Sequence, residues 1–112
     1  MTAISRVPGR LASDTPEFPR YNVVIYLDDG NAQAWTVPDD VKFVIISPTA
    51  ACWANLTTTA TVPAADSTDG TASFRIPANA ALQVRVPAGG SLSFIREAAS
   101  TMSISIGCWD NN

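Results

Sequence analysis

The sequence contains no histidine. Histidine is the usual general base near neutral pH and the commonest metal ligand, so its absence removes the Ser-His-Asp and Cys-His nucleophile systems and most zinc sites. The two cysteines, Cys52 and Cys108, have no CxxC companions that could complete a thiolate cage around a metal. We therefore expect that the protein is not an enzyme and that it holds no metal or other cofactor.

Positive charge is also scarce. Lys42 is the only lysine, and the net charge is −3. A chain without a basic patch cannot neutralise the phosphates of a nucleic acid, so we expect no nucleic-acid partner. Charged residues make up 15% of the chain, which is below the roughly 25% of typical globular domains. So few charges favour a surface that is partly covered by partner proteins.

Long hydrophobic segments are absent. No apolar run approaches the roughly 20 residues that cross a bilayer, so we expect no membrane contact. Residues 1–10 have no apolar segment of the kind that marks a secretory signal, and we expect the chain to be made in the cytoplasm. In that reducing compartment Cys52 and Cys108 are expected to be buried thiols, with one disulfide as the alternative.

Residues 1–20 differ in composition from the rest and are expected to form an extended N-terminal arm. They contain three prolines and show no period-2 alternation. Proline fixes φ and lacks the backbone donor, which excludes a long helix or a central strand. The arm either frays or lies on a neighbouring subunit, where Phe18 would anchor it. Three of the seven basic residues, Arg6, Arg10 and Arg20, lie here.

Residues 21–112 read as a series of short strands separated by turn signals. In 82–86, for example, Leu82, Val84 and Val86 alternate with Gln83 and Arg85. This pattern predicts an all-β, antiparallel β-sandwich, jelly-roll-like, with one core. A further run at 57–62 has β propensity on a polar face. The expected strands are 21–27, 32–37, 41–47, 52–56, 72–76, 82–86, 91–96 and 102–108.

Acidic residues occur in pairs at expected turns: Asp28-Asp29, Asp39-Asp40, and Asp66 with Asp69. Paired carboxylates can bind Ca²⁺ or perform acid–base chemistry. Aspartate is also a preferred turn residue, because its carboxylate accepts a hydrogen bond from the backbone two residues on. We favour the turn role, since residues 66–70 lack the alternating ligand spacing and the closing glutamate of a calcium loop.

Two tryptophans, Trp53 and Trp109, each follow a cysteine within an expected strand. If the cysteines point into the core, the tryptophans point to the opposite face, where an uncovered tryptophan is unusual. The cover could be a subunit interface, the arm or a sugar ring, whereas the opposite register would bury the tryptophans. We favour a cover of protein. The candidate interface residues are therefore Arg6, Arg10, Phe18, Arg20, Trp53 and Trp109.

Two segments carry a resemblance to small bacteriophage virion proteins. Residues 61–76 read TVPAADSTDGTASFRI, and residues 102–109 read MSISIGCW. From Val41 to Trp109 the chain resembles capsid decoration (cement) proteins or small tail-associated proteins, in which a segment of the first type precedes a short strand and one of the second type closes the chain. The resemblance implies a jelly-roll or related β-sandwich fold, no catalytic residues, and a place in the phage particle.

On that resemblance, the leading hypothesis is a capsid decoration protein of the phage head. It would form a homotrimer and bind the major capsid protein across capsomer junctions, which stabilises the shell. The alternative is a carbohydrate- or receptor-binding module of a tail or head fibre. That alternative needs an exposed tryptophan, Trp35, Trp53 or Trp109, flanked by polar side chains.

Overall fold

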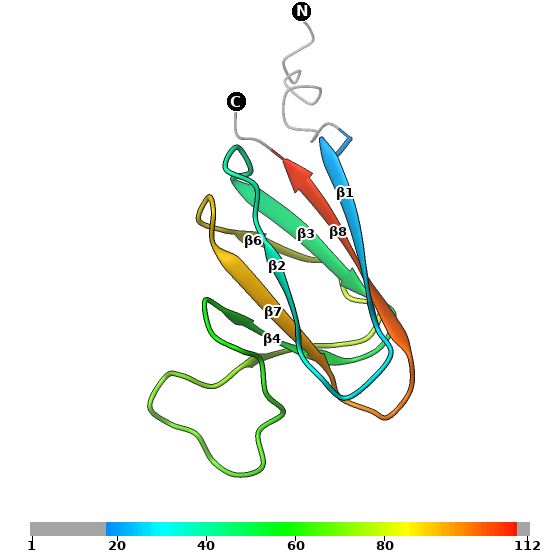
Figure 1. Cartoon of the computed structure of the whole chain (residues 1–112), viewed down its shortest axis with the longest axis vertical. Coiled ribbons are helices and arrows are strands. Elements are labelled where there is room, and N and C mark those ends of the chain that lie inside the picture. Colours follow the sequence, from blue (N-terminus) through cyan, green and yellow to red (C-terminus); the bar gives the residue numbers. More distant parts are fainter. Residues whose placement is uncertain (1–17, 110–112) are drawn as a thin grey trace, which may run out of the picture.

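The computed structural model describes residues 18–109, and these form eight strands and no helix (Figure 1). Within this range no helix is therefore long and apolar enough to cross a membrane. The strands are β1 (Tyr21–Leu27), β2 (Gln33–Thr36), β3 (Phe43–Pro48), β4 (Cys52–Leu56), β5 (Phe74–Ile76), β6 (Leu82–Arg85), β7 (Ser91–Arg96) and β8 (Met102–Trp109).

The strands form two four-stranded sheets that face one another (Figure 1). Sheet 1 has the order β1-β8-β3-β6, and sheet 2 has the order β2-β7-β4-β5. Every neighbouring pair is antiparallel. The prediction of an all-β, antiparallel, sandwich-like fold is confirmed.

The strand pairings are nested. β1 pairs with β8, β2 with β7, β3 with β6, and β4 with β5. The last four strands thus pair with the first four in reverse order, and the chain turns back in the long segment 57–73 between β4 and β5. As a result, Tyr21 near one end of the described chain lies opposite Cys108 near the other.

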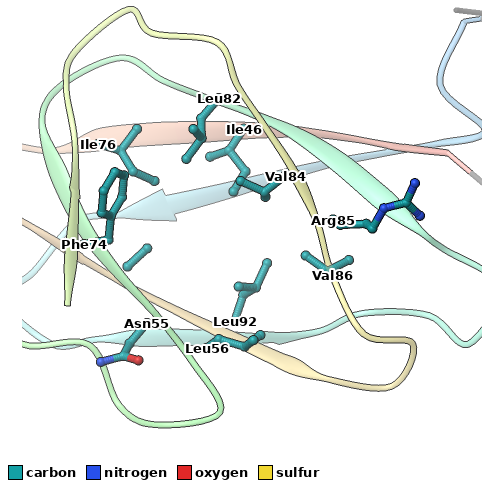
Figure 2. Close-up of a pocket in the computed structure, with 11 residues that line it drawn as sticks. Ile46, Asn55, Leu56, Phe74, Ile76, Leu82, Val84, Arg85, Val86 and Leu92 are labelled. Atoms are coloured by element: carbon teal, nitrogen blue, oxygen red, sulfur yellow. The ribbon is translucent and has the colours of Figure 1, made fainter. Parts of the chain in front are cut away.

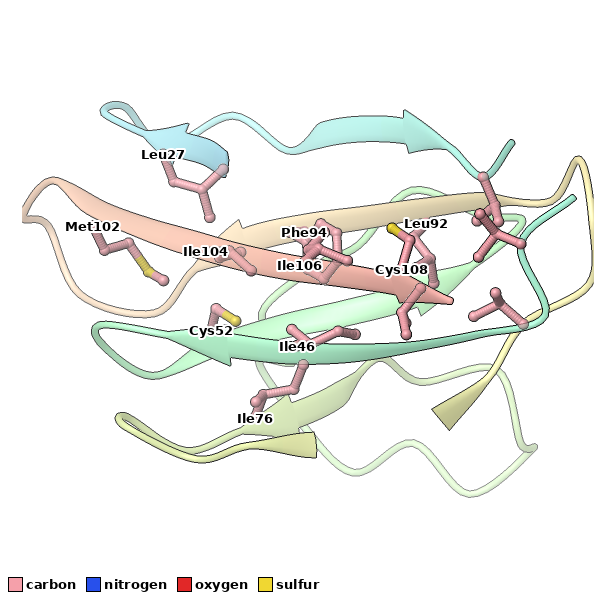
Figure 3. Packing of buried hydrophobic residues seen from close by; sticks show 14 residues of the cluster. Leu27, Ile46, Cys52, Ile76, Leu92, Phe94, Met102, Ile104, Ile106 and Cys108 are labelled. Carbon is pink, nitrogen blue, oxygen red and sulfur yellow. The ribbon is translucent and has the colours of Figure 1, made fainter. Parts of the chain in front are cut away.

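The core lies between the sheets and is apolar (Figure 3). In β8, Met102, Ile104, Ile106 and Cys108 are all buried, and the residues between them point outward. Strict alternation produces this arrangement, because successive side chains of a strand point to opposite faces. Cys52 of sheet 2 is buried as well, and both cysteines are free thiols, as expected.

The run 57–62 forms no strand, although its β propensity favoured one. Instead it packs over sheet 2. The Ala60 N–H donates a hydrogen bond to Ser93 Oγ at 2.9 Å, and the Thr61 N–H donates one to Ser73 Oγ at 3.0 Å. The β propensity of a residue reflects how well its side chain fits a pleated surface. It does not indicate whether a partner strand is available. These serine hydroxyls satisfy the backbone of the run in place of a strand.

The expected strand 72–76 is shorter in the structure and begins at Phe74. Its burial also differs from the simple alternation. Ser73 is buried, whereas Phe74 exposes 64% of its surface. Ser73 is buried because the run 57–62 covers it, and Phe74 is exposed because β5 is the last strand of sheet 2.

Candidate functional site

The outer surface of sheet 1 carries an extended area without charge, because β1, β8 and β3 contain no charged residue. Val24 and Tyr26 expose 55% and 67% of their surface there. The neighbouring strand β8 places only the small side chains of Ser103 and Ser105 opposite Tyr26 and Val24, so this area is nearly flat. This uncharged face comprises the outward residues Asn22, Val24, Tyr26, Phe43, Ile45, Ser47, Ser103, Ser105, Gly107 and Trp109.

Trp109 lies at one end of the uncharged face, paired with Phe43 across the β3–β8 ladder. The two rings are parallel, with centroids 5.1 Å apart. Gly107 makes room for this packing. A Cβ atom there would lie 2.9 Å from Pro19 Cγ and 3.2 Å from the Trp109 ring. Trp109 is therefore half-buried, and its ring and Pro19 both lie close to Gly107.

Arg20, a candidate interface residue, is joined to the domain. Its backbone N–H donates to the Cys108 carbonyl at 2.8 Å, and its guanidinium lies 3.3 Å from Asp40 Oδ2. The hydroxyl of Tyr21 also donates to Asp40 Oδ2, at 3.1 Å. Phe18, by contrast, exposes 84% of its surface.

The other two arginines proposed for the interface, Arg6 and Arg10, lie outside the described residues. Of residues 1–20, the structure describes only 18–20, where Arg20 binds the Cys108 carbonyl and Pro19 lies over Gly107.

Trp53 lies on the outer surface of sheet 2, where its own domain holds it. Its indole N–H donates to Glu97 Oε1 at 3.1 Å. Arg75 binds the same carboxylate through two hydrogen bonds, at 2.7 and 3.2 Å. Hydrogen bonding from Arg75, its positive charge and the Trp53 indole together lower the pKa of Glu97. Trp53 is thus half-buried and is held by a hydrogen bond within its own domain.

The Cys-Trp pairs have the register that the sequence favoured. Cys52 and Cys108 are fully buried, and Trp53 and Trp109 lie on the opposite faces of their strands. The sequence analysis missed Phe43, which packs against Trp109. Alternation within 41–47 signals a strand, but nothing in it indicates which strand lies alongside.

The thiols are poor nucleophiles. Burial raises the pKa of Cys52 to about 11, and the negative charge of Glu97 adds to this effect. Burial raises the pKa of Cys108 as well. Both side chains therefore stay protonated at neutral pH, and the thiolate is the reactive form of cysteine.

Two of the acidic residues hold turns, as expected for aspartate. The Asp69 carboxylate accepts hydrogen bonds from the backbone and the hydroxyl of Thr71, at 3.1 and 2.7 Å. Asp29 accepts one from the Asn31 N–H at 2.9 Å. Within residues 18–109, no group of three or more cysteine, aspartate or glutamate side chains is placed to hold a metal ion.

Comparison with protein-family models, with curated proteins and with solved structures finds no match for this chain.

Proposed function

We propose that this protein is a structural component of a phage head, a decoration protein that binds the major capsid protein and copies of itself. The observation that carries the proposal is the uncharged face of sheet 1, in which three adjacent strands contain no charged residue and β1 exposes Val24 and Tyr26. Charged residues are depleted at the centres of protein–protein interfaces, and aromatic residues are enriched there.

The size of this face favours assembly by repetition. Three strands spaced about 4.8 Å apart, each with about seven residues, give a footprint of about 300 Å². A stable interface buries about 800 Å² on each partner. One such contact is therefore too small alone, and several contacts made at once by a symmetric oligomer, which we propose to be a trimer, would bind by avidity.

We further propose that the fold is a jelly roll. The nested pairings and the orders β1-β8-β3-β6 and β2-β7-β4-β5 support this assignment. Jelly rolls occur in viral capsid proteins and in lectins, so the fold is compatible with the head location and does not by itself establish it.

Carbohydrate binding is the second candidate, and one observation favours it. A polar hollow of about 450 Å³ lies beside the Phe43–Trp109 stack and is lined by Phe43, Gln83, Val84 and Arg85. It combines an aromatic ring with an amide and a guanidinium, the groups that bind the faces and hydroxyls of sugars. Saturable binding on a glycan array that is lost in Phe43→Ala and in Arg85→Ala would support this candidate.

The decoration role is tested with Val24→Lys, which introduces a charge at the centre of the uncharged face. Val62→Lys is the matched control, because Val62 exposes 42% of its surface in the segment that covers sheet 2. Light scattering should show an oligomer for the wild type and Val62→Lys, and a smaller species for Val24→Lys. Electron microscopy of the parent particle should show the chain on the shell. Absence of its density from the shell would refute the decoration role.

A further inference from the structure

A cavity of about 350 Å³ opens between the two sheets at the edge formed by β5 and β6 (Figure 2). Aliphatic side chains of both sheets point into it, among them Ile46, Leu82 and Leu92. Two large apolar lining residues are exposed: Phe74, with 64% of its surface accessible, and Leu56, with 40%.

Water is a poor occupant for such a cavity. An ordered water needs two to four polar partners, and nearly all of the lining is hydrocarbon. A dry cavity of about 150 Å³ accommodates one benzene ring, so this cavity has room for about two aliphatic side chains. The walls therefore suit apolar side chains supplied by a polypeptide.

The segment that connects two lining residues of the cavity, Leu56 and Phe74, is acidic. Segment 57–73 begins directly after Leu56 and ends directly before Phe74, and it contains Asp66 and Asp69 but no lysine or arginine. Hydrogen bonds from Thr71 lower the pKa of Asp69, so this carboxylate is charged at neutral pH. Arg85 lies at the other end of the cavity, beside Val86 (Figure 2).

We propose that residues 1–17 of this chain occupy the cavity, with aliphatic side chains inside it and Arg6 and Arg10 facing the acidic segment. The composition matches on both counts. Residues 1–12 contain Ile4, Val7 and Leu11 before, between and after the two arginines, and the acidic residues of the segment, Asp14 and Glu17, follow this part. The repulsion of Arg85 directs the two arginines toward Asp66 and Asp69.

The length of the segment is sufficient. Seventeen residues span up to about 60 Å when extended. The four strands of sheet 1, from β1 to β6, are about 15 Å across. Residues 1–17 can therefore reach the cavity of their own domain or that of a second copy. The inference depends on the cavity and the acidic segment, so it can hold even if the virion role does not.

The test places a nitroxide spin label on Ser5→Cys in the full chain. Cys52 and Cys108 are buried and protonated, so the label attaches at the new thiol. A seated segment broadens the methyl resonances of Leu56 and Leu82, which line the cavity, and spares Leu27 at the far edge of sheet 1. Equal effects on all three, or none, overturn the proposal.

Two variants test whether the cavity is responsible. Ala54→Leu fills it, whereas the matched Ala34→Leu adds the same atoms at an exposed position of β2. Selective broadening should vanish in the first and persist in the second. If Ala54→Leu does not fold, Phe74→Ser removes an exposed wall and should likewise abolish the broadening. Broadening that survives the loss of the cavity contradicts the proposal.

Two further measurements define the docking. Asp66→Asn combined with Asp69→Asn should weaken the selective broadening, as should added salt. In an equal mixture of spin-labelled chains and isotope-labelled chains, broadening shows that the segment enters a second copy. Broadening confined to chains that carry both labels shows that it enters its own domain. In either case residues 1–17 are the occupant, whereas insensitivity to the aspartate changes contradicts the charge pairing.

Discussion

At the scale of single residues, the two thiols are protected by burial. Cys52 is fully buried and its pKa is raised to about 11. An ionised thiolate is the form that attacks disulfide reagents. We predict that Ellman's reagent at pH 8 modifies neither Cys52 nor Cys108 in the folded protein and modifies both in urea. Ser100→Cys, at an exposed position, is the control and should react at once. Reaction of the native protein at the rate of that control would contradict the prediction.

The raised pKa of Cys52 also gives the stability a pH dependence on the alkaline side. The folded protein binds the thiol proton more tightly than the unfolded chain does. Cys52 therefore contributes stability in full below the ordinary thiol value of 9.0, and this contribution is lost as the pH rises toward 11. Urea unfolding at pH 7 and pH 10.5 should show a smaller loss of stability in Cys52→Ala than in the wild type. Equal losses in the two proteins would contradict this account.

Glu97 gives the corresponding dependence on the acid side. Its pKa is lowered, first by hydrogen bonding to Arg75 and also by the charge of Arg75 and the Trp53 indole. Its contribution is therefore present above its ordinary value of 4.5 and is lost as the pH falls below it. We predict that the melting temperature falls less between pH 6 and pH 3 in Glu97→Gln than in the wild type. Arg75→Gln should behave alike, and the double variant should add little.

At the scale of elements, Gly107 couples β8 to the start of the described chain. A Cβ at this position meets Pro19 Cγ at 2.9 Å and the Trp109 ring at 3.2 Å. Gly107→Ala must therefore displace Pro19 or Trp109, and we predict a loss of about 1–3 kcal/mol in the free energy of unfolding, as for other overpacked sites. Gly30→Ala is the matched control, because nothing lies within 4 Å of its Cβ. Urea unfolding measures both, and equal stabilities would contradict the predicted clash.

Strand positions were predictable from the sequence because alternation is a local property. Strands β1, β4 and β7 have the same bounds as the strands that the alternation predicted. Partners were not predictable, because pairing depends on register between distant segments. For this reason the contact of Trp109 with Phe43 was missed, and the run 57–62 was credited with β propensity although no strand lies beside it.

The features of the candidate sites were likewise predictable where they depend on local sequence and not where they depend on contacts between distant segments. The outward direction of Trp53 and Trp109 followed from their position after buried cysteines, and the structure confirms it. The hydrogen bond of Trp53 to Glu97 joins residues 44 positions apart. The cavity depends on how far the sheets separate at β5 and β6. Neither of these two features has a local signal in the sequence.

At the scale of the whole molecule, the nested pairing joins the two ends of the domain. β1 and β8 are separated by residues 28–101, whereas β4 and β5 are separated only by 57–73. The entropy of loop closure grows with the logarithm of loop length, so closing the longer loop costs roughly 1 kcal/mol more. The hairpin of β4 and β5 should therefore form early, and the pairing of β1 with β8 should complete the sheet late. Folds dominated by such distant contacts fold in milliseconds to seconds.

This order of folding is testable with two matched substitutions. Ile76 in β5 and Ile106 in β8 are each 1% exposed, and Ile→Val at either position should cost about 0.5–1.5 kcal/mol. If β5 joins the early structure, Ile76→Val slows folding and leaves unfolding nearly unchanged. Because β8 docks late, Ile106→Val instead speeds unfolding and leaves folding nearly unchanged. Stopped-flow tryptophan fluorescence in urea measures both arms. The reverse partition, with Ile106→Val slowing folding, would show that the ends of the domain meet first.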